Sequence, residues 1–288
     1  DLTLWRNNLE EIDLSANTDL VYLDLDENNL TSVNLDTNSK LENLFISDNL
    51  LTSIDISNNS NIYQLELNND YLTSIELGNN LDLEYLYLDS NFITQIDISN
   101  NTNLFELDLD DNNLSSIDLS NNTALTELDI DRNQLTSIDV SSNTGLDNLE
   151  LKNNLLTTID VSNNTGLTEL DLHQNLLTTI DVSSNTELVY LDVDNNLLET
   201  INIDSNQNLE ELWIIENLLN QAAHDYLESL DGIGGLFVNK SASPMVVETI
   251  ASSSELSFVL ATGGNTSSAE FFGGSSADGG ITQGNSFF

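Results

Sequence analysis

The sequence predicts a mainly β solenoid, in which short coils stack on one another along a single axis. Three observations support this prediction: a repeat of twenty-one residues without insertions, apolar residues that alternate with polar ones inside the repeat, and two asparagines that recur once per repeat. A truncated first copy precedes ten full ones, so we expect eleven coils over residues 1–219. The full repeats begin at Leu20, Leu41, Ile62, Leu83, Leu104, Leu125, Leu146, Leu167, Leu188 and Leu209.

Each repeat contains six apolar positions, as in the unit LTELDIDRNQLTSIDVSSNTG of residues 125–145. Around Leu128 and Ile130 the apolar residues alternate with a period of two, which is typical of a strand with one buried face. We expect one such strand per coil, paired in parallel from coil to coil. The stretch around Ile138 and Val140 alternates as well and predicts a second, shorter extended segment.

Two columns of asparagine, with one residue per coil in each, mark the turns. A tight coil leaves inward-facing backbone groups without partners, and an Asn amide both donates and accepts hydrogen bonds. We therefore expect structural ladders and not ligand sites. The first column is Asn7, Asn28, Asn49, Asn91, Asn112, Asn133, Asn154, Asn175, Asn196 and Asn217, with Asp70 replacing Asn in the fourth coil. The second column is Asn17, Asn38, Asn59, Asn80, Asn101, Asn122, Asn143, Asn164, Asn185 and Asn206.

The motif LxxLxLxxN followed by xLxxIDLSxNxx resembles the short bacterial leucine-rich repeats with a nested second LxL, the IRREKO class, whose repeat has the same length. The likeness covers residues 1–219, and internalin-like surface proteins are a more distant likeness. It implies a right-handed leucine-rich-repeat solenoid in a secreted or cell-surface protein that binds other macromolecules. The family shares no catalytic motif, so the resemblance provides no active site, and we expect that the chain is not an enzyme.

The charge of the chain excludes several partners. Forty-nine acidic residues outnumber five basic ones and give a formal net charge of -44. Binding to nucleic acids or anionic membranes requires Lys and Arg, and no apolar run approaches the roughly 18 residues that suggest a membrane span. Cations are the natural small partners, and salt would screen the self-repulsion. The chain has no Cys, so disulfides do not stabilise it.

After residue 219 the repeat ends, and residues 220–242 are expected to cap the solenoid. Asn220 is a candidate N-cap for a short helix that stops by Gly232, and residues 236–238 suggest one last strand. The residues expected on one side of the helix are Ala222, Ala223, Tyr226, Leu227 and Leu230.

Residues 243–288 form a third unit, which is rich in Ser and Gly and poor in Asp and Asn. One interpretation is a flexible linker. The other is a tail with ordered strands at residues 244–251 and 255–262, where β-branched and aromatic residues gather.

Outward positions on the predicted strands form columns about 4.8 Å apart, and aromatic side chains gather there on coils three to six. Aromatic rings on a polar surface are frequent anchors for proteins or sugar rings, although single exposed aromatics are also common on sheets. The candidate binding residues are Phe45, Tyr63, Tyr85, Tyr87 and Phe105.

Carboxylates crowd the same face and are candidates for a metal site. Calcium suits such oxygen ligands and is the one cofactor we consider, although the fold requires none. The densest candidate set is Asp108, Asp110, Asp129 and Asp131, while His173 is read as an ordinary surface histidine. A further acidic column follows the second segment: Asp13, Asp55, Glu76, Asp97, Asp118, Asp139, Asp160 and Asp181. The alternative interpretation of all these acids is a solvated face.

Two functions remain open. The first is an extracellular binding or adhesion module, whose sheet face engages a protein or polysaccharide. The second is a structural subunit that assembles with copies of itself into head-to-tail filaments, through residues 243–288 and the first coil, with calcium as a further aid.

Overall fold

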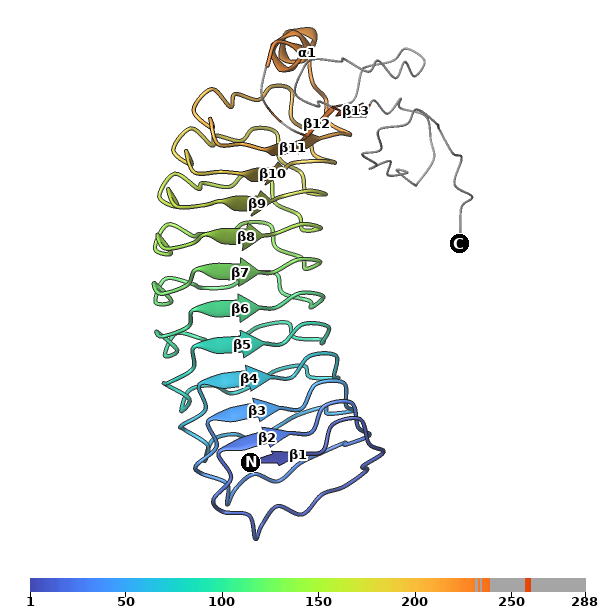
Figure 1. Ribbon diagram of the computed structural model, residues 1–288, viewed down its shortest axis with the longest axis vertical. Helices are drawn as coiled ribbons and strands as arrows, with labels where there is room; N and C mark the ends of the chain where they lie inside the picture. Colours follow the sequence, from blue (N-terminus) through green and yellow to red (C-terminus); the bar gives the residue numbers. More distant parts are fainter. Residues whose placement is uncertain (231–232, 234, 239–256, 260–288) are drawn as a thin grey trace, which may run out of the picture.

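In a computed structural model the chain is a parallel β solenoid, described here for residues 1–230, 233, 235–238 and 257–259. Thirteen strands form one sheet in chain order, and every neighbouring pair is parallel. Figure 1 shows them stacked as successive rungs, with helix α1 at the C-terminal end. The prediction of a leucine-rich-repeat solenoid with eleven coils and a parallel sheet is confirmed.

Each of the eleven coils contributes one very short strand, and two further strands follow the last coil. The strands are β1 (Leu2–Thr3), β2 (Tyr22–Asp24), β3 (Asn43–Phe45), β4 (Gln64–Glu66), β5 (Tyr85–Tyr87), β6 (Glu106–Asp108), β7 (Glu127–Asp129), β8 (Asn148–Glu150), β9 (Glu169–Asp171), β10 (Tyr190–Asp192), β11 (Glu211–Ile214), β12 (Gly235–Val238) and β13 (Ser257–Val259). From β2 to β11 each strand pairs with the next at a shift of one whole repeat, so equivalent positions of the repeat lie side by side.

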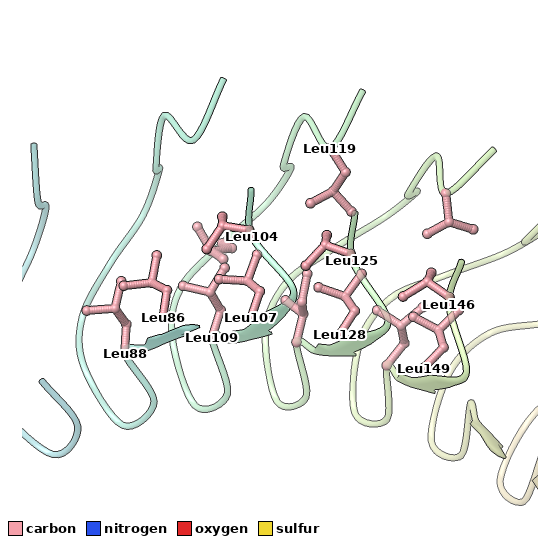
Figure 2. Packing of buried hydrophobic residues seen from close by; sticks show 14 of the residues in the cluster. Leu86, Leu88, Leu104, Leu107, Leu109, Leu119, Leu125, Leu128, Leu146 and Leu149 are labelled. Atoms are coloured by element: carbon pink, nitrogen blue, oxygen red, sulfur yellow. The ribbon is translucent and has the colours of Figure 1, made fainter. Parts of the chain in front are cut away.

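The core is a column of aliphatic side chains between the sheet and the opposite turns. Leu104, Leu107 and Leu109 are at most 1% exposed, and Figure 2 shows such leucines pointing inward from consecutive coils. Burial of one leucine side chain is worth roughly 2 kcal/mol. A single coil cannot bury these residues alone, so stacking on its neighbours provides the stability. Of the six apolar positions in residues 125–145, only Ile138 is merely half-buried.

The second extended segment expected in each coil does not join a sheet, because no strand occurs at residues 136–145. The backbone turns there through two short hydrogen bonds, from Asn143 N–H to Val140 O at 3.0 Å and from Leu146 N–H to Asn143 O at 3.1 Å. The Asp139 carboxylate accepts the Ser141 N–H at 2.9 Å. Local bonds of this kind compete with a sheet ladder and bend the chain.

The first asparagine column is a complete ladder, as expected. Asn112 Oδ1 accepts the Ile93 N–H at 2.9 Å, and its Nδ2 donates to Leu88 O, Leu109 O and Asp110 O at 2.9, 3.2 and 3.0 Å. One buried amide therefore joins its own turn to the preceding coil. The same pattern recurs along the column, except at Asp70.

In the second asparagine column, the side-chain Nδ2 has hydrogen-bond partners and the side-chain Oδ1 has none among the described residues. Asn122 Nδ2 donates to Ile98 O at 3.0 Å and to Asn101 O at 2.9 Å. Its Oδ1 is buried and accepts no hydrogen bond within the described part of the chain. The nearby N–H groups of Asn122 and Leu125 are already used in the turn. The expectation that this column would satisfy donors and acceptors alike therefore holds only for the carbonyls.

A third column, which we call the left-handed column, lies between the sheet and the first ladder. Its members have φ between 48° and 57°, a region that disfavours residues with a Cβ. No glycine occurs in it. The column is Arg6, Glu27, Asp48, Asn69, Ser90, Asp111, Arg132, Asn153, Gln174, Asn195 and Glu216.

Helix α1 (Gln221–Glu228) covers the C-terminal end of the core, and Asn220 is its N-cap, as predicted. Asn220 Oδ1 accepts the Ala223 N–H at 3.0 Å. Ala223, His224 and Leu227 are its buried residues. The placement of Ala222 on the buried side is wrong, because this residue is exposed.

Helix α1 ends at Glu228, before the predicted stop at Gly232, which lies outside the described residues. The predicted last strand is confirmed as β12, which pairs with β11. In the Ser/Gly-rich region, β13 pairs with β12. The rest of residues 243–288 lies outside the described residues, so the filament hypothesis for this tail stays a prediction.

Candidate interaction surface

The outward side chains of the strands define the sheet face. Within each strand, the middle residue is buried and the two flanking residues point away from the core, as in Tyr85–Tyr87. The residue two positions beyond the strand, such as Asp89, continues the same alternation. The parallel register aligns these positions into columns. Each column consists of the residues at one repeat position in successive coils.

The five predicted aromatic residues fall into two groups. Tyr85 and Phe105 contact each other, with ring centroids 6.1 Å apart, and Tyr87 lies on the same strand as Tyr85. Phe45 instead pairs with Tyr22 at 5.2 Å, a partner that sequence reasoning missed. Tyr63 and Phe105 each lie two residues before the buried leucine of their strand, at the entry side of the face.

Glu66 separates the two aromatic groups. In the sheet register it lies between Phe45 on β3 and Tyr87 on β5. Burial among these rings, despite a hydrogen bond from Gln64, raises the pKa of the Glu66 carboxyl. Burial and a hydrogen bond with Glu106 also raise the pKa of the Tyr87 phenol. The surface therefore presents neutral, partly desolvated aromatic groups around one carboxyl.

The predicted metal residues do come together, on β6 and β7 and the turns after them. Ligand atoms of Asp108, Asp110 and Asp129 lie within 4.8 Å of one another, and so do those of Asp129, Asp131 and Glu150. Burial raises the pKa of Asp108 and of Asp131 to about 7. Burial and the neighbouring acids also raise the pKa of Asp129 well above its usual range. Oxygen-rich sets of this kind can hold a hard cation or share protons.

Two basic side chains of the protein itself lie in this acidic set. Arg132 Nη2 is 2.9 Å from Asp110 Oδ2, and Lys152 Nζ forms an ion pair with the fully buried Asp131. Lys152 Nζ also lies 3.1 Å from Glu150. Asp110 and Asp131 are thus neutralised by the chain, and the negative charge that remains for an added cation is reduced.

His173 differs from the ordinary surface histidine that we expected. Its Nδ1 lies 2.8 Å from Asp171 Oδ1 and 3.5 Å from Asp192 Oδ2, and both aspartates are buried. Burial alone would lower the pKa of His173, but the hydrogen bond and charge of Asp171, with the charge of Asp192, raise it. These three residues form a third group with ligand atoms within 4.8 Å.

Sequence reasoning missed a column of exposed apolar residues on another surface, directly after the first ladder. We call it the turn edge; in Figure 1 the strand arrowheads point toward it. Tyr71 and Phe92 stack there with centroids 6.0 Å apart and an interplanar angle of 17°. A test of every repeat position, instead of the strand positions alone, would have found it. The exposed apolar members are Leu50, Tyr71, Phe92, Leu155, Leu176, Leu197 and Leu218.

The chain matches no protein-family model and no curated protein. Solved structures do match. The functional domain of InlJ from Listeria monocytogenes, which includes a cysteine ladder, is 28% identical over 79% of this chain and 50% of its own, with a TM-score of 0.69. A leucine-rich-repeat protein of Leptospira interrogans is 24% identical over 82% and 64%, with a TM-score of 0.74. The internalin InlF of L. monocytogenes is 26% identical over 82% and 79%, with a TM-score of 0.67.

The protein is therefore a leucine-rich-repeat solenoid protein. Within that class its solenoid is internalin-like, although it spans only 50% and 64% of the InlJ and Leptospira chains. Leucine-rich-repeat chains solved in complexes with other proteins or with a peptide hormone also match, at 22% and 20% identity, and share the fold. None of the helices in the described part of the chain has the length and apolar character of a membrane span.

Proposed function

We propose that the chain is a protein-binding module that works outside the cell or on its surface, and that the sheet face around β3 to β6 holds the partner. The observation that carries this proposal is the pair of aromatic contacts, Tyr22 with Phe45 and Tyr85 with Phe105, on a rigid polar sheet. Aromatic anchors of this kind supply contact area at low conformational cost.

Two further features support a protein partner. The coils are joined by a hydrogen-bonded ladder of Asn side chains, in which Asp70 of the fourth coil replaces one amide, so the face is organised before a partner arrives. The leucine-rich-repeat matches solved with protein partners use the same fold, and we extend that role to this chain. The excess of carboxylates favours a partner whose surface is basic and apolar, since complementary charge speeds association.

The test is a screen of extracellular protein and glycan arrays with the purified chain, followed by affinity measurement on the strongest hit. Replacement of both Tyr85 and Tyr87 by Ala should weaken that affinity about 10- to 100-fold. Tyr190→Ala is the matched control, because Tyr190 occupies on β10 the position that Tyr85 occupies on β5. Equal loss in both variants, or no loss in the double variant, would contradict the proposal. A hit confined to glycans would replace the protein partner with a polysaccharide.

Calcium binding by Asp108, Asp110, Asp129 and Asp131 stays a prediction. Because Arg132 and Lys152 already pair with two of these acids, we expect weak affinity, with a Kd of about 1 mM. Titration calorimetry with calcium, on the chain and on the variant Asp108→Asn with Asp129→Asn, measures it. An unchanged heat of binding in the variant would remove these residues from the site.

A further inference from the structure

The turn edge contains a hollow next to its aromatic pair. The hollow has a volume of about 270 Å³ and combines the apolar side chains Leu50, Tyr71 and Phe92 with polar groups. The three apolar side chains are 40%, 50% and 50% exposed. The polar lining is Asn28, Asp48, Asn49, Asn69, Asp70 and Ser90, so no basic residue belongs to it.

The chain itself shows how acids at the turn edge accept a cation. In the left-handed column, Arg6 contacts Glu27 of the next coil with Nε 2.8 Å from the carboxylate, and Arg132 Nε lies 2.7 Å from Asp111. Arg6 also lies over the ring of Trp5, 4.5 Å from its centroid. Asp48 belongs to the same column, and its carboxylate accepts a hydrogen bond from the uncharged Asn69 amide of the next coil. Asp48 forms no ion pair within the described part of the chain, and the rings of Tyr71 and Phe92 line the same hollow.

We propose that this hollow is a docking site for a partner polypeptide with an arginine beside an apolar residue. The guanidinium would lie against the Asp48 carboxylate and over the stacked rings of Tyr71 and Phe92, as Arg6 lies against Glu27 and Trp5. The apolar neighbour would contact Leu50. Cation–π contact and a charge-assisted hydrogen bond favour arginine here. This surface lies apart from the sheet face and does not depend on the function proposed for that face.

The probe is the peptide acetyl-Leu-Arg-Leu-amide, with a citrulline version that keeps the shape and removes the charge. We expect saturable changes in the aromatic NMR signals of Tyr71 and Phe92 with the arginine peptide, and at least tenfold weaker binding of the citrulline peptide. Asp48→Asn should cause the same loss. Leu176→Ala, on the same column far from the hollow, should change nothing. Absence of saturation, or equal binding to Asp48→Asn, would overturn the proposal.

A second inference concerns Asp70, the one acid in the first ladder. Its Oδ1 accepts the Leu51 N–H at 2.8 Å, as each Asn Oδ1 does 19 residues before it. Its Oδ2 therefore occupies the place of the amide Nδ2. At every neighbouring coil that Nδ2 donates to carbonyls two, three and 24 residues earlier. The equivalent carbonyls for Asp70 belong to Asn68, Leu67 and Ile46.

A carboxylate oxygen cannot donate to these carbonyls. Asp70 is 3% exposed, and its Oδ2 is buried without a hydrogen-bond partner among the described residues. The charged groups that act on it are Asp48 and Asp26 from the two preceding coils, while the next coil presents the uncharged Asn91. Asp48 and Asp26 oppose a negative charge at Asp70, and the hydrogen bond from the Leu51 N–H only partly offsets burial.

We infer that Asp70 is a neutral carboxylic acid whose O–H replaces the ladder amide, and that loss of this proton loosens the junction between the coils of β3 and β4. Burial, reinforced by the charge of Asp48, raises the pKa of Asp70 to about 7. Asp70 also lines the hollow of the turn edge, so its deprotonation near neutral pH would change that surface as well.

The decisive measurement is the titration of the Asp70 side-chain carbon by NMR, together with amide exchange at Leu51. We expect a midpoint about three units above that of an exposed aspartate, and opening of the Leu51 amide about tenfold more frequent at pH 8 than at pH 6 after correction for intrinsic exchange. Asp70→Asn restores the ladder amide and should abolish this change in opening, and Asn112→Asp should transfer it to Ile93. A midpoint near 4, or an Asp70→Asn variant with the same pH dependence as the wild type, would overturn the inference.

Discussion

Aspartates of the turns and aspartates of the sheet face have opposite electrostatics. Asp118 and Asp139 are exposed on the side of the solenoid away from the sheet, where hydrogen bonds from Ser120 and Ser141 lower their pKa values. Asp108 on the sheet face is more buried, and burial raises its pKa to about 7. In both sets, neighbouring carboxylates lie at the same repeat position on adjacent coils.

The comparison shows that the spacing between coils does not determine whether the pKa of a carboxyl is raised or lowered. In the turns, each aspartate of the acidic column accepts the N–H of the serine two residues on, at 2.9 to 3.0 Å, and water screens its neighbours. On the sheet face, Asp108 accepts the Asp110 N–H two residues on in the same way, at 3.0 Å, but its burial reduces screening by water and the low dielectric strengthens repulsion. The turn acids hold the backbone, and the face acids store unfavourable charge that protons, cations or a partner can relieve.

The largest expected effect on stability comes from an ion pair on the sheet face. Lys152→Met removes the ion-pair partner of the fully buried Asp131, and we expect a loss of about 3 kcal/mol in the free energy of unfolding at pH 8. Lys40→Met is the control, because its pair with Asp19 is mostly exposed and screened by water, so its loss should leave stability unchanged. Chemical denaturation of both variants measures the difference. Equal losses would show that burial of the pair does not matter.

The next effect is the pH dependence of the Tm. A carboxyl with a raised pKa binds its proton more tightly in the folded state, so it adds stability as pH falls through the folded pKa. Asp108 and Asp131 at about 7 and Asp194 at about 8 place this gain between pH 8 and 5. Those turn acids whose pKa is lowered lose their contribution only near pH 4 and below. We expect the Tm to rise by roughly 5 °C from pH 8 to pH 5.

Scanning calorimetry at several pH values tests this expectation. Asp108→Asn should flatten the rise, and Asp139→Asn should leave it unchanged. A Tm that falls between pH 8 and pH 5 would mean that the raised pKa values of the face acids are wrong.

A smaller effect is expected at the turns. Asp139→Ala removes the acceptor for the Ser141 N–H and should lower the Tm by about 2 °C. Asp139→Asn should be neutral, because Asn34 and Asn202 already make the same contact in other coils, at 2.9 Å each. If both variants lost stability equally, the charge of Asp139 and not its hydrogen bond would be responsible.

The smallest effect belongs to the left-handed column, which tests the backbone without a change of charge. Ser90 has φ of 57°, where glycine has no steric penalty. The greater freedom of glycine in the unfolded chain offsets part of the gain, so Ser90→Gly should raise the Tm by about 1 °C, equally at pH 5 and pH 8. A destabilised variant would show that the Ser90 side chain contributes more than its backbone strain costs.

The repeat made the fold predictable from the sequence, whereas the contacts between surface side chains were harder to predict. The constant repeat length, the alternation around Leu128 and the asparagine columns are local patterns that determine coil length, strand position and ladder. Alternation around Ile138 did not reveal that this segment stays outside the sheet, because the hydrogen bond between Asp139 and the Ser141 N–H is local. Asn220 was recognisable as a cap, but the helix end at Glu228 was not.

The sheet-face site was only partly predictable. Sequence columns grouped the aromatic residues, yet the pairing of Tyr22 with Phe45 depends on side-chain orientation across two strands. The position of Lys152 against Asp131 depends on the length of a flexible side chain, which no repeat pattern encodes. The turn edge was visible in the sequence as a column, but its significance depends on exposure, which the structure supplied.

The ladder spacing also bears on how such a chain changes length over evolution. The first ladder joins residues separated by 19 and 24 positions, and both separations stay the same if one whole repeat is removed or duplicated within the uniform coils. A crossover between two coils therefore recreates every ladder bond between new neighbours. Recombination can lengthen, shorten or shuffle the array while the residues of the sheet face change one coil at a time.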